Sequence, residues 1–205
     1  MIALVDYGAG NLKSVLNAFE TIGVKTKVVD KSSEIERASA IVLPGVGAFG
    51  DSMKTLKRLK LIEALDEQIF VKKKPYLGIC LGLQFLATKS LEQGEHQGFG
   101  WVEGITRKIQ PESREFRIPH IGWNEVTVLR ESPLFDGIES PVFYFVHSYH
   151  LELADSDKKY LVGTSWHGET ITAAVQKDNI FGVQFHPEKS QGAGLAVLRN
   201  FIKLI

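Results

Sequence analysis

The chain has 205 residues, a length that fits one or two domains, and its 44% hydrophobic and 23% charged residues are typical of a globular protein. Lys plus Arg and Asp plus Glu each number 24, so the formal charge is zero, which argues against non-specific nucleic-acid binding. The single cysteine excludes an intrachain disulfide and favours a reducing compartment. No signal-peptide pattern and no run of ~18 apolar residues is present, so the predicted location is cytoplasmic.

The first hundred residues alternate apolar runs of strand length with segments of helical periodicity. Strands are predicted at 2–5, 24–29, 41–43 and 76–79, and helices at 12–22, at 53–69 and from 81 onward. Strands and helices that alternate at this spacing indicate βαβ units, so a mostly parallel sheet is expected.

From about residue 98 the pattern changes to short strands joined by turns. These strands are predicted at 126–128, 142–146, 160–163, 170–175 and 180–185, with a hairpin loop at 177–179 and a last helix at 195–205. Several connections are too short for a helical crossover, which favours antiparallel pairing. The predicted fold is α/β, with a mostly parallel central sheet, flanking helices and a smaller antiparallel β section. Residues 1–205 contain no linker and are expected to form a single domain.

The lone cysteine lies in Gly78-Ile79-Cys80-Leu81-Gly82, between an apolar strand and a helix. This G-x-nucleophile-x-G pattern is typical of a tight turn that exposes a nucleophile at the carboxyl edge of a sheet. The N-terminus of the following helix would favour the thiolate, and the Leu81 N–H would be a natural oxyanion donor. The alternative is an inert core cysteine beside packing glycines.

A second candidate segment is Gln184-Phe185-His186-Pro187-Glu188. Pro187 keeps His186 out of the α region, and residues i and i+2 of an extended segment point to the same side. Glu188 can therefore orient the His186 ring and stabilise its imidazolium, as in a Cys-His-carboxylate triad. A surface turn is the alternative interpretation.

Two glycine-rich segments fail as nucleotide-binding motifs. Gly45 and Gly50 have the spacing of a P-loop, but Asp51 stands where that loop has lysine. The segment 8–10 lacks the third glycine of a dinucleotide fingerprint. The first of these loops can still turn backbone N–H groups toward an oxyanion.

The segments PGVG, GICLG and HPE, in that order, resemble the class I glutamine amidotransferases, whose amidase domains use Cys, His and Glu. The 106-residue separation of Cys80 and His186 is typical of that family, and the resemblance covers essentially the whole chain. Within it, DYGAGNL, PHIGWN and FVHSY look like the glutaminase subunits of imidazole glycerol phosphate synthases, from histidine biosynthesis. Those subunits often have Met at Ile121 and vary at His150, and neither change touches the chemistry.

The resemblance implies a conditional glutaminase without metal or cofactor. Cys80 would attack the glutamine carboxamide, His186 would protonate the leaving ammonia and activate water, and Glu188 would orient His186. The ammonia would pass to a (β/α)₈-barrel synthase (cyclase) subunit that makes imidazole glycerol phosphate and AICAR. The other implied positions are the oxyanion donors Leu81 and Val46, the glutamine-pocket residues Gly47, Gln84, His147, Ser148 and Tyr149, and the partner-facing residues Asn11, Trp123 and Lys189.

Several alternatives remain open. Gln84 can be a solvated helix residue, and Asn11 a helix cap. A glutaminase subunit of anthranilate or aminodeoxychorismate synthase is disfavoured by the DYGAGN and PHIGWN segments, and a non-catalytic scaffold by the complete triad. A zinc site at His147 and His150 is disfavoured because positions i and i+3 of one strand point to opposite faces. Ser190 is predicted to be the N-cap of the last helix.

Overall fold

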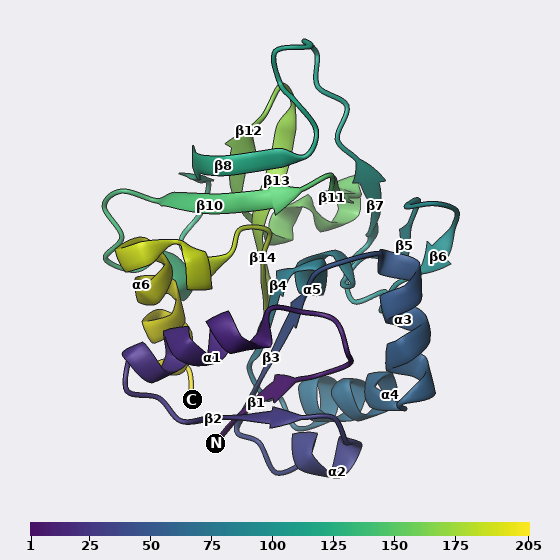
Figure 1. Cartoon of the computed structure of the whole chain (residues 1–205), viewed down its shortest axis with the longest axis vertical. Helices are drawn as coiled ribbons and strands as arrows, with labels where there is room; N and C mark the ends of the chain where they lie inside the picture. The colour runs from purple at the N-terminus through teal and green to yellow at the C-terminus, as the bar shows by residue number, and fades with distance from the viewer.

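The computed structural model describes all 205 residues and is built around an eight-stranded sheet that draws strands from both halves of the chain (Figure 1). Its parallel part has the order β2-β1-β3-β4-β14, with β1 Ile2–Val5, β2 Thr26–Val29, β3 Ala40–Gly45, β4 Tyr76–Cys80 and β14 Ile180–Val183. The sheet continues with antiparallel strands, which are β13 Thr170–Lys177, β12 Leu161–Trp166 and β9 Thr127–Val128. The predicted α/β class with a mostly parallel sheet is confirmed.

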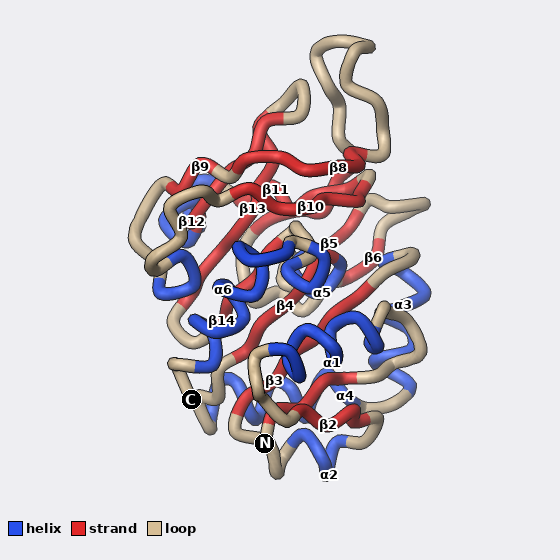
Figure 2. The backbone as a smooth tube through the Cα atoms, turned by 60° about the vertical axis from the view of Figure 1, so that its left-hand side comes forward, coloured by secondary structure: helices blue, strands red, loops and turns tan.

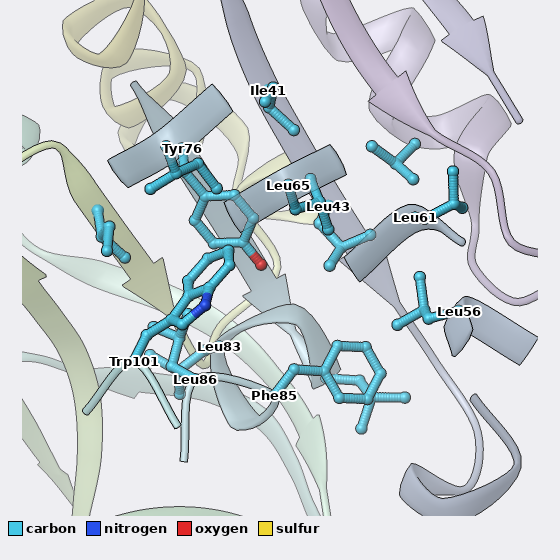
Figure 3. Close-up of a cluster of buried hydrophobic side chains, with 14 of the residues drawn as sticks. Ile41, Leu43, Leu56, Leu61, Leu65, Tyr76, Leu83, Phe85, Leu86 and Trp101 are labelled. Atoms are coloured by element: carbon cyan, nitrogen blue, oxygen red, sulfur yellow. The ribbon is translucent and has the colours of Figure 1, made fainter. Parts of the chain in front are cut away.

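Helices cover both faces of the parallel strands (Figure 1). One face carries α1 Leu12–Thr21 and α6 Gln191–Ile202, and the other carries α2 Ser32–Ile35, α3 Phe49–Arg58 and α4 Leu61–Asp66. Alternate residues of β3 enter the two cores. Ala40 and Val42 pack with the first group of helices. Ile41 and Leu43 pack with the second group, in the cluster drawn in Figure 3. Burial on both faces explains why these strands are continuous apolar runs rather than alternating patterns.

Two smaller sheets lie beyond the carboxyl ends of the parallel strands. One pairs β8 His120–Glu125 with β10 Val142–His147, and the other has the order β11-β7-β5-β6, with β5 Lys89–Ser90, β6 His96–Gln97, β7 Gly104–Lys108 and β11 Tyr149–Leu153. Figures 1 and 2 both show β8 and β10 crossing above α5 (Leu81–Gln84), which directly follows β4. The expected smaller β section is therefore present, although the sequence patterns did not reveal β5, β6, β7, β8 or β11.

The third strand and the helix expected at 53–69 differ from their predicted boundaries. The third strand was expected to end before Pro44, but it runs to Gly45. β1 pairs with β3 only as far as Val42, so the later residues of β3 have no hydrogen-bonding strand on that side. A residue without an N–H is tolerated there. The helix expected at 53–69 is interrupted at Lys60, whose left-handed φ of 55° separates α3 from α4, and it ends in the π-helical turn Glu67–Val71. Neither Gly nor Pro marks this break in the sequence.

The C-terminal third of the chain follows the sequence patterns closely. β13 and β14 form the predicted hairpin, whose two-residue turn has a left-handed φ of 52° at Asp178. Short 3-10 helices occur at Pro133–Phe135, Asp155–Tyr160 and Pro187–Lys189. α6 starts at Gln191, four residues before the first apolar position of the predicted helix. None of the helices combines the length and apolar character that a membrane span requires.

Candidate active site

Cys80 lies at a strained turn between β4 and α5, as the glycine pattern predicted. Its backbone has φ 55° and ψ −106°, a conformation that residues with a side chain rarely adopt. The turn is possible because the strand and the helix approach very closely: a Cβ on Gly78 would lie 2.4 Å from the Gly82 carbonyl oxygen, and a Cβ on Gly82 would lie 1.9 Å from that of Leu43. The Tyr76 hydroxyl donates to the Gly82 carbonyl at 3.0 Å. The glycines therefore set the position of the sulfur.

α5 is shorter than the sequence indicated. It has four residues, so its dipole contributes less positive charge at Cys80 than a long helix would. The facing imidazole of His186 is the stronger source of positive charge at the sulfur.

His186 follows β14, the strand that pairs directly with β4. The in-register pair Val183 and Ile79 brings the segment after β14 beside the end of β4. The His186 Nδ1 atom lies 2.7 Å from the Glu188 Oε1 atom, and both side chains are almost fully buried. Glu188 belongs to a 3-10 turn rather than to the extended segment that was predicted, but it lies on the expected side of His186. Because a carboxylate only accepts, the proton of the neutral ring sits on Nδ1 and Nε2 is left for the reaction.

The pKa of His186 reflects its position between Cys80 and Glu188. Burial alone would lower the pKa of His186, but the negative charge of the Cys80 thiolate and the hydrogen bond to Glu188 outweigh it and raise this pKa to about 10. At neutral pH His186 is therefore an imidazolium, and a positive charge beside a cysteine is the arrangement that activates a thiol nucleophile.

The main chain of His186 is fixed on both sides. Its N–H donates to the Tyr144 carbonyl at 2.9 Å, and its carbonyl accepts from the Ser190 hydroxyl at 2.6 Å. Ser190 also accepts from the Tyr144 N–H at 2.9 Å. Ser190 is thus at the N-cap position of α6, as predicted, but its side chain makes no capping bond and anchors the His186 segment to β10 instead.

A cavity of about 340 Å³ opens beside Cys80 and is large enough for an amino acid. It brings together the predicted pocket residues and both predicted oxyanion donors; its lining consists of Val46, Gly47, Cys80, Leu81, Gln84, Glu92, Pro119, Val146, His147, Ser148 and Tyr149. Gly47 has a left-handed φ of 101°, and Val46 is 41% exposed. Every residue that the resemblance assigned to glutamine binding therefore borders one cavity.

Two polar side chains at or beside the cavity, those of Glu92 and Gln184, were not predicted as site residues. Glu92 accepts the Phe49 N–H at the start of α3 with a distance of 2.8 Å, and no local pattern announces this contact across 43 residues. Gln184 donates from Nε2 to the Cys80 sulfur at 3.5 Å and is fully buried. The i, i+2 relation between Gln184 and His186 was the signal that could have placed Gln184 on the same side.

Two of the predicted partner-facing residues contact the same ring, and the third caps a helix that packs against the turn carrying Glu188. Trp123 on β8 is 49% exposed and packs edge-to-face on Tyr144, with ring centroids 6.1 Å apart. The Lys189 ammonium lies 5.7 Å from the centroid of the same Tyr144 ring. Asn11 caps α1, where it accepts the Ser14 N–H at 3.4 Å, and α1 packs against the turn at 187–189.

The two histidines considered for zinc belong to different sheets. His147 ends β10 and His150 lies on β11, so they do not share one strand as was assumed. No group of three or more His, Cys, Asp or Glu side chains is arranged to hold a metal ion.

Known proteins resemble the chain over its full length. The family model of glutamine amidotransferase class-I matches residues 3–204. Imidazole glycerol phosphate synthase subunit HisH 1 of Campylobacter jejuni (strain RM1221) is 46% identical over 205 residues, which are 100% of both chains. The HisH subunit of Methanothermobacter thermautotrophicus is 45% identical over 205 residues, covering 100% of this chain and 99% of the relative.

Solved structures show the same fold. A crystal structure of a glutamine amidotransferase superposes with a TM-score of 0.77 at 16% identity, covering 100% of this chain and 98% of the other. PurLQS from Thermotoga maritima gives a TM-score of 0.74 at 19% identity, covering 99% and 97%. Together with the family match and the full-length relatives, these findings assign the family: the chain belongs to the class I glutamine amidotransferases.

Proposed function

We propose that this chain is the glutaminase subunit of an imidazole glycerol phosphate synthase and hydrolyses glutamine to glutamate and ammonia. The observation that carries the proposal is the alignment of Cys80 with the His186–Glu188 pair beside a cavity of amino-acid size. The full-length relatives named after that synthase support the choice of complex. Residues 1–205 act as one catalytic domain, and the single cysteine, which must stay reduced to react, favours the cytoplasm.

The reaction has two halves that both use the triad. The Cys80 thiolate attacks the side-chain carboxamide carbon of glutamine, and the resulting oxyanion accepts hydrogen bonds from the N–H groups of Leu81 and Val46. The His186 imidazolium protonates the leaving nitrogen, so ammonia departs and a glutamyl thioester remains. His186 then removes a proton from water, which attacks the thioester carbon and releases glutamate with the thiolate restored. Glu188 keeps the ring in the reactive tautomer throughout.

The cavity supplies the remaining substrate contacts. Gln84 and His147 form part of its wall, and Gly47, Ser148 and Tyr149 complete the glutamine pocket. The ammonia passes to a (β/α)₈-barrel synthase (cyclase) subunit, which uses it to make imidazole glycerol phosphate and AICAR. Asn11, Trp123 and Lys189 face that subunit.

The test measures glutamate release by the chain alone and with the barrel subunit and its nucleotide ligand. We expect slow hydrolysis by the chain alone, because the loop at 44–47 must rearrange to supply the Val46 donor, and one missing oxyanion donor costs ~10²–10³ in rate. Full activity without the partner would refute this gating. Stimulation by a chorismate-using synthase instead would assign the chain to a different complex.

The nucleophile is tested in the assembled complex. Cys80→Ala should abolish glutamine-dependent synthesis while leaving ammonia-dependent synthesis intact, because ammonia enters after the glutaminase step. Retained use of glutamine by this variant would refute the assignment of Cys80. The ammonia reaction is the matched control, since it reports folding and docking without using the triad.

A further inference from the structure

A continuous series of hydrogen bonds runs from β8 to the wall of the cavity. The Asn124 Nδ2 atom donates to the Trp166 carbonyl at 2.8 Å and lies 3.1 Å from the His120 Nε2 atom. His120 Nδ1 lies 3.0 Å from His147 Nε2, and His147 Nδ1 lies 2.9 Å from the Tyr149 carbonyl oxygen. Both histidines are buried.

Hydrogen-bond chemistry fixes the direction of every bond in this series. The Tyr149 carbonyl can only accept, so His147 carries its proton on Nδ1 and accepts at Nε2. His120 must then donate from Nδ1 and accept at Nε2 from the Asn124 amide. The Asn124 Oδ1 atom accepts the Glu125 N–H at 2.9 Å, which excludes the flipped amide. Each imidazole is therefore neutral and held in one tautomer.

The surroundings keep both rings neutral and in place. Burial lowers the pKa of His120 to about 4 and the pKa of His147 to about 3. The His120 ring is stacked between Phe145, at 4.7 Å and 18°, and His167, at 4.0 Å and 21°. Rotation of the His120 ring would break both stacks as well as the hydrogen bonds.

A second arm joins the same carbonyl to the nucleophile. The Gln84 Nε2 atom donates to the Tyr149 carbonyl at 2.8 Å and to the Gln184 Oε1 atom at 3.2 Å. The Gln184 Nε2 atom donates in turn to the Cys80 sulfur at 3.5 Å. The Tyr149 carbonyl is thus the point where the His147 arm and the Gln84 arm meet.

We propose that His120 is a positioning residue for glutamine binding. By donating to His147 Nε2 it selects the tautomer that clamps the Tyr149 carbonyl, and this carbonyl orients the Gln84 amide at the wall of the cavity. His120 itself does not line the cavity. The inference rests on the proposed function, because it assigns this wall to the binding of glutamine.

Loss of the His120 donor should therefore weaken substrate binding more than chemistry. We expect His120→Ala, in the complex with the barrel subunit, to raise KM for glutamine about tenfold, the effect of one lost hydrogen bond, with kcat within about threefold. His120→Asn should restore most of the affinity, because its amide nitrogen takes the place of Nδ1. His167→Ala is the comparison variant: it removes one of the two rings stacked on His120 and leaves the hydrogen bonds of His120 in place, so KM should rise less than in His120→Ala.

Three results would overturn the proposal. One is an unchanged KM in His120→Ala when the unmodified complex uses glutamine normally. Another is an equal loss in the Asn and Ala variants. The third, which needs no variant, is a ¹⁵N spectrum of the unmodified chain that shows the His147 proton on Nε2. An unmodified complex that releases no glutamate would instead refute the proposed function. In each variant, intact ammonia-dependent synthesis confirms that the variant chain folds and docks.

Discussion

Acidification from pH 7 to pH 5 should weaken the fold, because three buried histidines stay neutral in the native protein. Burial lowers the pKa of His147 to about 3 and those of His120 and His150 to about 4. For His150 the neighbouring Arg107 adds to the effect of burial. In the unfolded chain each imidazole returns to the ordinary value of about 6.5.

The sign and size of the effect follow from proton linkage. Between pH 6.5 and about 4 the unfolded chain binds protons that the native protein does not, so the free energy of unfolding falls as the pH falls. Each of the three histidines costs about 2 kcal/mol at pH 5 relative to pH 7, at about 1.4 kcal/mol per pKa unit. His186 opposes them: its pKa is raised, so its stabilisation is fully present below pH 6.5 and is lost toward pH 10, and it adds about 1 kcal/mol over the same interval. The net loss is about 5 kcal/mol, a large part of the stability of an ordinary domain.

Urea unfolding at pH 7, 6 and 5, followed by tryptophan fluorescence, measures this loss of unfolding free energy. These pH values lie above the ordinary pKa values of Asp and Glu. The control is His150→Leu, which removes one titrating group. This substitution breaks no hydrogen bond of the ring, because both ring nitrogens of His150 lack hydrogen-bond partners. This variant should lose about a third of the histidine contribution to the pH dependence. Equal stability at pH 7 and pH 5 would refute the reasoning, as would an unchanged pH dependence in the variant.

Two further predictions concern the turn and the triad. Gly82→Ala should destabilise the fold by more than about 3 kcal/mol, because its Cβ would meet the Leu43 carbonyl oxygen at 1.9 Å. Gly192→Ala, where nothing lies within 4 Å on helix α6, should stabilise by up to about 1 kcal/mol; similar melting temperatures for the two variants would contradict this. Glu188→Gln should lower the pKa of His186 and reduce kcat by up to ~10⁴, because the ring loses its carboxylate partner. The pH–rate profile of glutamate release checks this, and an unchanged kcat would refute the orienting role.

The turn at Cys80 and the His186–Glu188 pair could be predicted because their determinants are local. Glycines two residues to either side of the cysteine permit the close strand–helix contact, and a proline next to the histidine fixes its backbone. The hairpin at Asp178 is equally local. Such features depend on neighbours within a few residues, and the sequence displays those directly.

The wall of the cavity depends on long-range contacts and could not be derived from local patterns. Gln84 reaches the Tyr149 carbonyl across 65 residues, and Glu92 reaches the Phe49 N–H across 43. The segment after residue 142 has the alternation of one continuous strand, yet the chain changes sheets at Ser148, because β10 pairs with β8 while β11 pairs with β7. Only the family resemblance placed His147, Ser148 and Tyr149 in one pocket before the structure did.

The pairing of β4 with β14 sets the moment at which the thiol becomes reactive during synthesis. This parallel contact joins residues about one hundred positions apart, and such long-range pairs form late because closing the intervening loop costs entropy. A nascent chain that has emerged only through β13 already contains the cysteine and its glycine turn but lacks the imidazole and the carboxylate. Its thiol therefore lacks the activating imidazole, so a ribosome-bound fragment ending near residue 178 should react more slowly with an alkylating reagent than the full-length chain.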